Sequence, residues 1–344
     1  MKPEITPEIL FLKQEDVVKA GLLDMKQVLA AVELTYKMFG EGKIVNHPKV
    51  STKIPDAANW TSFFNSMPCY IGGDIHVAGI KWACEAKGNK DIEGLPWGID
   101  SIILSDPDTV LPIAYMDGTL ITAMRTSAVG GVYAKYNAPK GCKQAALIGA
   151  GVIGRTMIMA ICESVPTIEE ILLVDLDLAK AEGLVEEFKD VYPNVKIIPS
   201  TDVAVAATKA PLIVCQTTAA KNLILPEMVQ KGNTVINMSG DVSIEVMRMA
   251  DQIFVDYFEQ MLHNNIRGIV DLHASGELTQ ENVVELKDLA TGSHPGRKNN
   301  DETLYCGSMG FAALDIMVAN TMYLNAKKMG LGQKLVLWDK SLWV

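Results

Sequence analysis

The sequence predicts an α/β protein with a doubly wound parallel sheet and a second, mixed α/β domain, and two observations carry this prediction. An apolar run of strand length at residues 144–149 leads into three glycines spaced G-x-G-x-x-G, and an apolar run of helix length follows them. From residue 144 to residue 256, strand-like and helix-like segments alternate. Such alternation is typical of a parallel sheet with helices on both faces, which is the Rossmann arrangement.

The first part of the chain is expected to form one helix and then several strands. Residues 16–41 place apolar side chains at helical spacing after Asp24, which can cap the helix, and Gly40 and Gly42 end it. The proline after His47 excludes helix there, so an extended region begins. Strand-like runs follow at residues 62–64, 69–71, 76–82, 101–104 and 111–115, and then a helix from about 119 to 136.

The rest of the chain consists of the alternating region, a helical and loop-like region, a long helix and an apolar tail. Strands are expected at 144–149, 171–174, 196–199, 212–216, 233–238 and 252–255, helices at 179–191 and 311–328, and helix and loop over 257–305. The tail at 334–338 is expected to return to the first domain, because it is too apolar to be a free extension. We therefore predict a discontinuous substrate-binding and dimerisation domain, residues 1–125 with 315–344, and a dinucleotide-binding domain, residues 126–314.

The glycine motif predicts a dinucleotide-binding loop. Gly149 permits a tight turn, Gly151 lets the backbone approach a pyrophosphate, and Gly154 lets the following helix pack closely on the strand. Val152 and Ile153 lie at the start of that helix, whose free N–H groups and positive dipole end favour a pyrophosphate. The alternative is a similar domain that binds no nucleotide.

An acidic residue after the second strand of this region favours NAD over NADP. Asp175 follows the apolar run 171–174, and no arginine occurs among the next four residues. A carboxylate there accepts hydrogen bonds from the adenosine ribose hydroxyls and repels a 2′-phosphate. The alternative is a solvated Asp175 without a ligand.

Composition and charge exclude several other classes of function. The chain of 344 residues is 49% hydrophobic and 21% charged, as in an ordinary globular protein, and is long enough for two cores. Its net charge of −10 and the lack of a Lys/Arg cluster argue against nucleic-acid binding. No apolar run reaches the length of a membrane span, no signal-peptide core is present, and scattered cysteines indicate a reduced, cytoplasmic protein. The histidines show no ligand spacing, so no metal is expected.

Three charged residues outside the glycine motif could carry chemistry. Lys81 interrupts an apolar strand, where an inward lysine is costly unless it is paired or used; the alternative is that it faces solvent. Arg125 could grip a carboxylate or form a surface salt bridge. Asp241 follows the fifth strand, at the edge where such sheets bind ligands, and could act on substrate, cap the next helix, or do both.

Three threonines are further candidates for contact with the cofactor. Thr217 and Thr218 end the fourth strand and could contact ribose or phosphate; the alternative is ordinary turn chemistry. Thr126, which follows Arg125 directly, is also expected to bind the cofactor.

These motifs together resemble the ornithine cyclodeaminase/mu-crystallin family over almost the whole chain. The matching segments are Leu12–Val17, Met67-Pro68…Gly72-Gly73, Gly79–Lys81, Asp106–Thr109, Met116–Thr119, Thr122–Thr126, Ile148–Gly151, Gly240-Asp241, Pro295–Arg297, Glu302 and Gly310…Asp315. The resemblance implies NAD(P)(H)-dependent redox chemistry at the α-carbon of an amino acid, through an imine, in a homodimer paired through the first domain. It also implies that Lys81 and Arg125 hold the substrate carboxylate and that Asp241 moves protons or water at the amine or imine carbon.

Two departures from the family pattern bear on the substrate. Lys49 stands where the family usually has an arginine after proline, so this substrate-binding candidate supplies charge but no fork. The segment after Asp241 is shorter than in typical cyclodeaminases. With Gly79–Trp82 it resembles the branch that contains N-(2-amino-2-carboxyethyl)-glutamate dehydrogenase.

The sequence leaves three functions open. The first, which we expect, is an NAD(H)-dependent amino-acid dehydrogenase, imine reductase or opine-type dehydrogenase with a small amino-acid or imino-acid substrate. The second is a cyclodeaminase, in which NAD is reduced and reoxidised within one cycle and ammonia leaves. The third is a binding protein of the mu-crystallin type; the presence of Lys81, Arg125 and Asp241 argues against it, because pure binding needs no proton-transfer group.

Overall fold

The computed structural model describes residues 7–54, 62–219 and 221–343, and the chain divides into two compact units. Unit 1 comprises residues up to 31, 42–125 and those from 311 onward, and unit 2 comprises residues 32–41 and 126–310. The domain limits expected above, at 125/126 and 314/315, stay a prediction; the compact units change at Arg125/Thr126 and at Gly310/Phe311. Residues 32–41 belong to unit 2, and the sequence did not predict this. The change of unit between residues 31 and 32 falls inside the continuous helix α2 (Met25–Gly40), where no break in the sequence pattern marks it.

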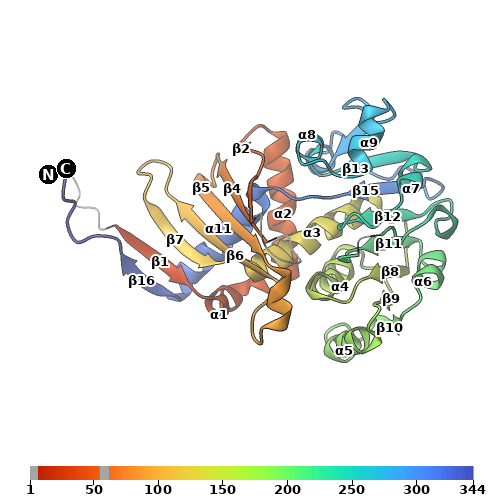
Figure 1. Cartoon of the computed structure of the whole chain (residues 1–344), viewed down its shortest axis with the longest axis horizontal. Helices are drawn as coiled ribbons and strands as arrows, with labels where there is room; N and C mark the ends of the chain where they lie inside the picture. Colours follow the sequence, from red (N-terminus) through yellow and green to blue (C-terminus); the bar gives the residue numbers. More distant parts are fainter. Residues whose placement is uncertain (1–6, 55–61, 220, 344) are drawn as a thin grey trace. The chain divides into compact units, whose positions relative to one another are not determined.

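Unit 1 is built on a sheet with the strand order β16-β1-β7-β6-β5-β4-β2, in which β3 also pairs with β4 (Figure 1). The strands are β1 (Glu8–Leu12), β2 (Ile44–Asn46), β3 (Val50–Lys53), β4 (Phe63–Ile71), β5 (Val77–Glu85), β6 (Gly98–Ser105), β7 (Pro112–Asp117) and β16 (Gln333–Val336). β1 and β7 run parallel, whereas β16 is antiparallel to β1. The C-terminal tail therefore returns to the first unit, as the sequence predicted.

The long helix α11 (Ala312–Met329) packs on one face of this sheet. Gly79 of β5 lies against it, and a Cβ atom there would stand 2.8 Å from Cδ1 of Ile316, so the contact leaves no room for a side chain. Because side chains alternate along a strand, Lys81 and Ala83 share the face of Gly79 and are buried, whereas Trp82 points to the other face. The short elements of unit 1 are α1 (Gln14–Val17), the π-helical turn η1 (Val18–Leu22) and the 3₁₀ turn η2 (Lys87–Asp91).

Unit 2 is built on a sheet with the strand order β10-β9-β8-β11-β12-β15-β13-β14. The strands are β8 (Gln144–Ile148), β9 (Glu170–Val174), β10 (Lys196–Ser200), β11 (Leu212–Cys215), β12 (Thr234–Asn237), β13 (Gln252–Val255), β14 (Val283–Glu285) and β15 (Leu304–Gly307). Every neighbouring pair is parallel, which confirms the predicted doubly wound sheet. The strand order reverses between β8 and β11, and sheets of this type bind ligands at such a point.

Helices and turns connect the strands of unit 2. They are α4 (Val152–Ser164), α5 (Leu178–Phe188), α6 (Val203–Lys209), η3 (Pro226–Met228), α7 (Ile244–Arg248), α8 (Phe258–His263), α9 (Ile269–Ala274) and α10 (Leu286–Thr291). The helices α2 and α3 (Thr119–Asn137) each contribute residues to both units. Within the described ranges, no helix has both the length and the apolar character that crossing a bilayer requires.

Two sequence predictions about local structure are wrong. The helix expected over 16–41 is interrupted, because Gly21 has a φ of +103° and α2 begins only at Met25. The region 257–305, expected to be helix and loop, also contributes β14 and the start of β15. β15 lies between β12 and β13 in the sheet, and strands of three or four residues are too short to show a periodic pattern.

Candidate active site

The glycine-rich loop between β8 and α4 has the geometry that close approach of a phosphate group requires. Gly149 has a φ of +112°, and a Cβ atom there would stand 2.9 Å from the carbonyl oxygen of Gln216. A Cβ atom on Gly154 would stand 2.1 Å from the carbonyl oxygen of Gly149, so only glycine fits there. A Cβ atom on Gly151 would instead point into open space, where a pyrophosphate can approach the backbone. These residues fit a dinucleotide.

Asp175 lies beside this loop, at the end of β9. Its Oδ2 accepts a hydrogen bond from the backbone N–H of Ala150 at 2.8 Å, and its Oδ1 accepts one from Asp177 at 3.0 Å. The carboxylate therefore fixes the glycine loop, a contact that the sequence did not reveal. Each oxygen keeps a further lone pair for a ribose hydroxyl, so the predicted role stays compatible with this geometry.

Asp241 is the centre of a buried hydroxyl-lined cluster in unit 2. The side chain is 2% exposed, and its Oδ2 accepts hydrogen bonds from Thr217 Oγ1 at 2.5 Å and from Ser239 Oγ at 2.8 Å. No described residue donates to Oδ1, so this oxygen remains available to a proton of a substrate or water. The alternative that Asp241 caps the following helix is wrong, because Ser243 is the N-cap of α7.

The residues around Asp241 differ from what the sequence suggested. Thr217, predicted to contact the cofactor, turns its hydroxyl toward Asp241, and Ser239 was not foreseen although it lies only two residues before it. Cys215 lies 3.8 Å from the same carboxylate. Burial, reinforced by the charge of Asp241, raises the pKa of the Cys215 thiol far above its ordinary value. This environment disfavours the thiolate form in which a cysteine acts as a nucleophile.

In unit 1, Lys81 is buried, and its ammonium group is surrounded by hydrogen-bond and ion-pair partners. It is 2% exposed, and its Nζ donates to Thr122 Oγ1 and to Asp315 Oδ1, both at 3.0 Å. It also lies 3.4 Å from Oδ2 of Asp100. The alternative that Lys81 faces solvent is wrong. Two of the three ammonium protons thus have hydrogen-bond acceptors, and the carboxylate of Asp100 lies within ion-pair distance of the same nitrogen.

Arg125 is the cation with donors to spare. It is 7% exposed, and its Nε donates to Oδ1 of Asp315 at 2.9 Å. No described residue accepts from its two terminal nitrogens, which form the fork that matches a carboxylate. The alternative that Arg125 forms a surface salt bridge is wrong.

Asp315 joins the two cations. It is completely buried, its Oδ1 accepts from both Lys81 and Arg125, and its Oδ2 has no hydrogen-bond partner. Burial opposes ionisation, but the charges of Arg125 and Lys81 outweigh it and hold the pKa of Asp315 below its ordinary value. With Asp100 as second carboxylate, the two positive charges are balanced before any ligand binds. The role of Asp315 was missed, although an acidic residue within an apolar helix is a signal of pairing.

For the other predicted site residues, the structure gives a position in the fold but no contact that defines a role. Lys49 precedes β3, one position before Val50, which pairs with Ser66. Val152 and Ile153 begin α4, Thr126 is the first residue of α3 in unit 2, and Thr218 is exposed. Their roles stay predictions. Among the described side chains, no three His, Cys, Asp or Glu residues are grouped so that they could hold a metal ion.

Comparison with known proteins agrees with this geometry. The model of the ornithine cyclodeaminase/mu-crystallin family matches residues 8–330. The N-((2S)-2-amino-2-carboxyethyl)-L-glutamate dehydrogenase of Staphylococcus aureus is 29% identical over 334 residues, which cover 96% of this chain and 99% of that protein. The solved structure of Thermococcus litoralis Delta(1)-pyrroline-2-carboxylate reductase, in complex with NADH and L-proline, is 30% identical with a TM-score of 0.84 and covers 94% and 99% of the two chains. An archaeal alanine dehydrogenase dimer with bound NAD is 27% identical with a TM-score of 0.84 and covers 96% and 100%.

Proposed function

Because the chain belongs to the ornithine cyclodeaminase/mu-crystallin family, we propose that it is an NAD(H)-dependent oxidoreductase acting on the C–N bond of an α-amino acid. The observation that carries the proposal is the buried Lys81–Arg125–Asp315 cluster, in which the guanidinium fork keeps free donors. Burying two cations costs free energy, and here the burial leaves a guanidinium fork that can bind a carboxylate. A protein that only bound a dinucleotide would gain nothing from this arrangement. Similar proteins act on amino acids and cyclic imino acids, which supports the same class of substrate here.

The proposed roles follow from the free atoms of each cluster. Arg125 binds the substrate carboxylate, Lys81 and Asp315 hold the guanidinium in place, and Lys49 adds positive charge. Asp241 accepts the proton of the α-amino group through Oδ1, while Thr217 and Ser239 hold Oδ2. The glycine loop and Asp175 would hold NAD⁺, which would provide the acceptor for the α-hydrogen as hydride when it is bound. The amino acid thereby becomes an imine, and water converts the imine to an oxo acid and ammonia.

A fluorescence screen for NADH tests the proposed function. The enzyme is supplied with NAD⁺ and single L-amino acids, or with NADH, ammonia and 2-oxo acids or cyclic imines, and ammonia is measured in parallel. We expect NADH to form in step with ammonia from at least one amino acid. Ammonia released without net NADH would identify a cyclodeaminase instead, and cofactor binding without any turnover would favour the binding protein.

NADH is expected to bind more tightly than NADPH, because Asp175 repels a 2′-phosphate. Asp175→Ser should reduce the ratio of the NADPH and NADH dissociation constants by about tenfold, which corresponds to about 1.4 kcal/mol of binding free energy. Fluorescence titration with both cofactors measures the effect. Asp177→Asn is the matched control, because it removes an acidic charge two positions away and should leave the ratio unchanged. Equal affinities in the unaltered protein would refute the role of Asp175.

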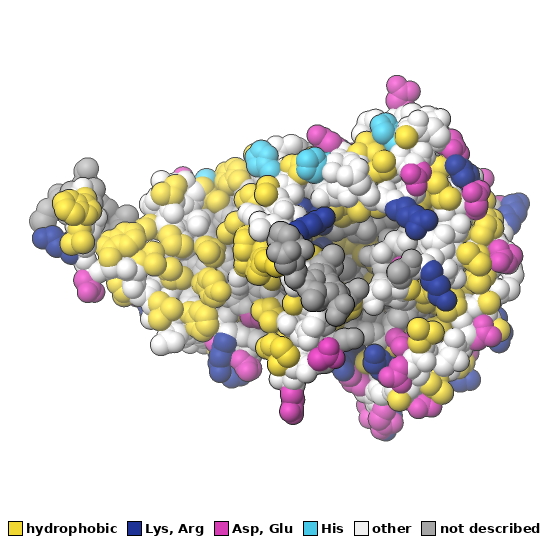
Figure 2. All heavy atoms as spheres, viewed as in Figure 1, with side chains coloured by type: hydrophobic (Ala, Val, Ile, Leu, Met, Phe, Trp, Pro, Cys, Tyr) yellow, Lys and Arg dark blue, Asp and Glu magenta, His cyan; other side chains and the backbone are white. Residues whose placement is uncertain are grey.

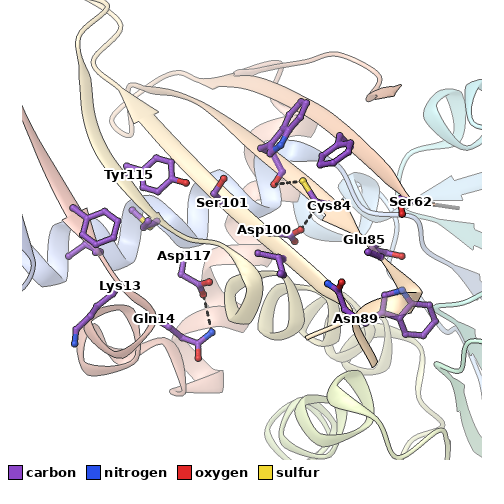
Figure 3. A pocket seen from close by; sticks show the side chains of 18 of the residues that line it. Lys13, Gln14, Ser62, Cys84, Glu85, Asn89, Asp100, Ser101, Tyr115 and Asp117 are labelled. Carbon is purple, nitrogen blue, oxygen red and sulfur yellow. Dashed lines mark hydrogen bonds between the residues drawn. The ribbon is translucent and has the colours of Figure 1, made fainter. Parts of the chain in front are cut away.

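The apolar face of the unit 1 sheet supports a homodimer. Opposite α11, this face exposes Trp82, Ile99, Ile103 and Tyr115 by 37–44% each, and hydrophobic side chains gather over this sheet (Figure 2). A hollow of about 750 Å³ lies there, with Tyr115, Ser101 and Asp117 among its lining residues (Figure 3). Contiguous apolar surface of this kind marks interfaces rather than free surface. We propose that a second copy of the chain covers it.

Analytical ultracentrifugation should therefore show a species of twice the chain mass of 37.4 kDa. Ile103→Glu should shift it toward the monomer, because it places a charge in the interface. Val205→Glu, on an equally apolar exposed position of α6 in unit 2, should leave the dimer intact. A monomer for the unaltered chain would contradict the proposal.

The free thiols of all six cysteines support the proposal that the protein acts in the cytoplasm, where thiols stay reduced.

A further inference from the structure

Asn237, the last residue of β12, uses its side-chain amide to hold the turn that leads to Asp241. The residue is 5% exposed, and its Oδ1 accepts hydrogen bonds from the backbone N–H groups of Gly240 at 2.8 Å and Ser239 at 3.3 Å. Gly240 has a φ of +92°, so the chain turns sharply one residue before Asp241. The position of Asp241 therefore depends on a turn that a buried amide closes.

Tyr305 of β15, the strand next to β12 (Figure 1), orients this amide. Its hydroxyl oxygen accepts a hydrogen bond from Nδ2 of Asn237 at 2.9 Å, and the residue is 2% exposed. Because the two backbone N–H groups of the turn require an oxygen on their side, the NH2 group must face the tyrosine. Burial raises the pKa of the Tyr305 hydroxyl well above its ordinary value, so its oxygen stays a neutral acceptor.

A glycine makes the contact between these two side chains possible. Gly307 lies directly opposite Asn237 in the register of β12 and β15, two residues after Tyr305. A Cβ atom on Gly307 would stand only 3.2 Å from Cε1 of Tyr305, which is closer than an ordinary carbon–carbon contact. The tyrosine ring therefore lies over the glycine, where its hydroxyl reaches the amide.

Further contacts hold Asp241 on the other side of the turn. Its backbone carbonyl oxygen accepts hydrogen bonds from the N–H groups of Leu223 at 2.6 Å and Ile224 at 3.2 Å. An asparagine that only closed a turn could do so at the surface of the protein, whereas Asn237 is buried and paired with a side chain of the next strand. Buried polar groups are tolerated when they are paired, and the pair then fixes one orientation of each side chain.

We propose that Asn237 and Tyr305 are positioning residues for proton transfer, in which Tyr305 fixes the amide and the amide fixes the loop that carries Asp241. This inference rests on the proposed function, in which Oδ1 of Asp241 accepts the proton of the α-amino group. Proton transfer requires hydrogen-bond distance, so a displacement of the loop by about 1 Å costs roughly 10²-fold in rate. Cofactor affinity should not change, because the glycine loop and Asp175 follow other strands, β8 and β9.

Steady-state kinetics with NAD⁺ and the most active L-amino acid of the NADH screen test this role. Tyr305→Phe removes only the hydroxyl and should lower kcat about tenfold, while KM and the dissociation constant of NADH change by less than about twofold. Asn237→Ala should lower kcat about 10²-fold. The double variant should be no slower than Asn237→Ala alone, because Tyr305 acts only through Asn237. The solvent deuterium isotope effect on kcat should rise in both single variants, because proton transfer then limits the rate.

Thr234→Val, at the other end of β12, is the matched control. Thr234 is completely buried and its hydroxyl donates to the carbonyl oxygen of Asn137 at 2.5 Å, so the variant should lower the thermal midpoint but not kcat. An unchanged kcat in Tyr305→Phe, an unchanged isotope effect, or a double variant in which the two losses multiply would each overturn the role of the pair. Absence of turnover in the unaltered enzyme, or full activity of Asp241→Asn, would instead overturn the proposed function.

Discussion

Asp241→Ala is expected to lower kcat by about 10²- to 10⁴-fold, the range typical for the loss of one general acid or base. The dissociation constant for NADH should change little, because the glycine loop and Asp175 hold the cofactor without Asp241. Steady-state kinetics and fluorescence titration measure the two effects separately. Asp241→Asn keeps the shape and the hydrogen bonds to Thr217 and Ser239 but accepts no proton, so it should be nearly as inactive.

The hydroxyls that hold Asp241 provide the control for this interpretation. Ser239→Ala should cost much less activity than Asp241→Asn, because Thr217 still holds Oδ2. If Asp241→Asn kept most of the activity, proton transfer by this carboxylate would be excluded. An equal loss of NADH affinity would show instead that Asp241 belongs to the cofactor site.

Arg125→Ala is expected to reduce kcat/KM by roughly 10²- to 10³-fold, mainly through a higher KM. The substitution removes the fork for the substrate carboxylate, and it also leaves Asp315 with Lys81 as its remaining cation. Breaking one side of a buried charge pair is strongly unfavourable, by about 3–5 kcal/mol. Arg125→Lys should recover part of the loss, since it restores charge without the two-pronged geometry.

Stability must be followed alongside these kinetics. Arg248→Ala is the matched control, because Arg248 pairs with Glu245 and Glu277 on the exposed surface of unit 2 and should leave kcat/KM unchanged. If Arg125→Ala lowered the melting temperature but not the affinity for substrate, Arg125 would be structural. A KM unchanged in both Arg125 variants would contradict its role in carboxylate binding.

The parts of the fold that follow from local pattern could be predicted from the sequence. The G-x-G-x-x-G loop, the apolar strands around it and Asp175 lie within one contiguous stretch, so their spacing alone indicates a parallel sheet. The long helix α11 was equally evident, because its apolar character extends over five turns of sequence. The break at Gly21 was missed because a single glycine within a periodic apolar pattern also fits a continuous helix.

The clusters that carry chemistry depend on contacts between distant residues. Asp315 reaches Arg125 and Lys81 over sequence separations of 190 and 234, and no periodicity or motif reports such a contact. For the same reason, the hydroxyl of Thr217 was assigned to the cofactor rather than to Asp241, which lies in the loop that follows the neighbouring strand β12.

The central claim is that hydride leaves the α-carbon of an amino acid and stays on NAD as a net product. Mass spectrometry of the cofactor after reaction with an α-deuterated amino acid tests this most directly. We predict NADH that carries one deuterium and accumulates in proportion to the amino acid consumed. Substrate consumed without net NADH, or NADH that carries no deuterium, would contradict the account.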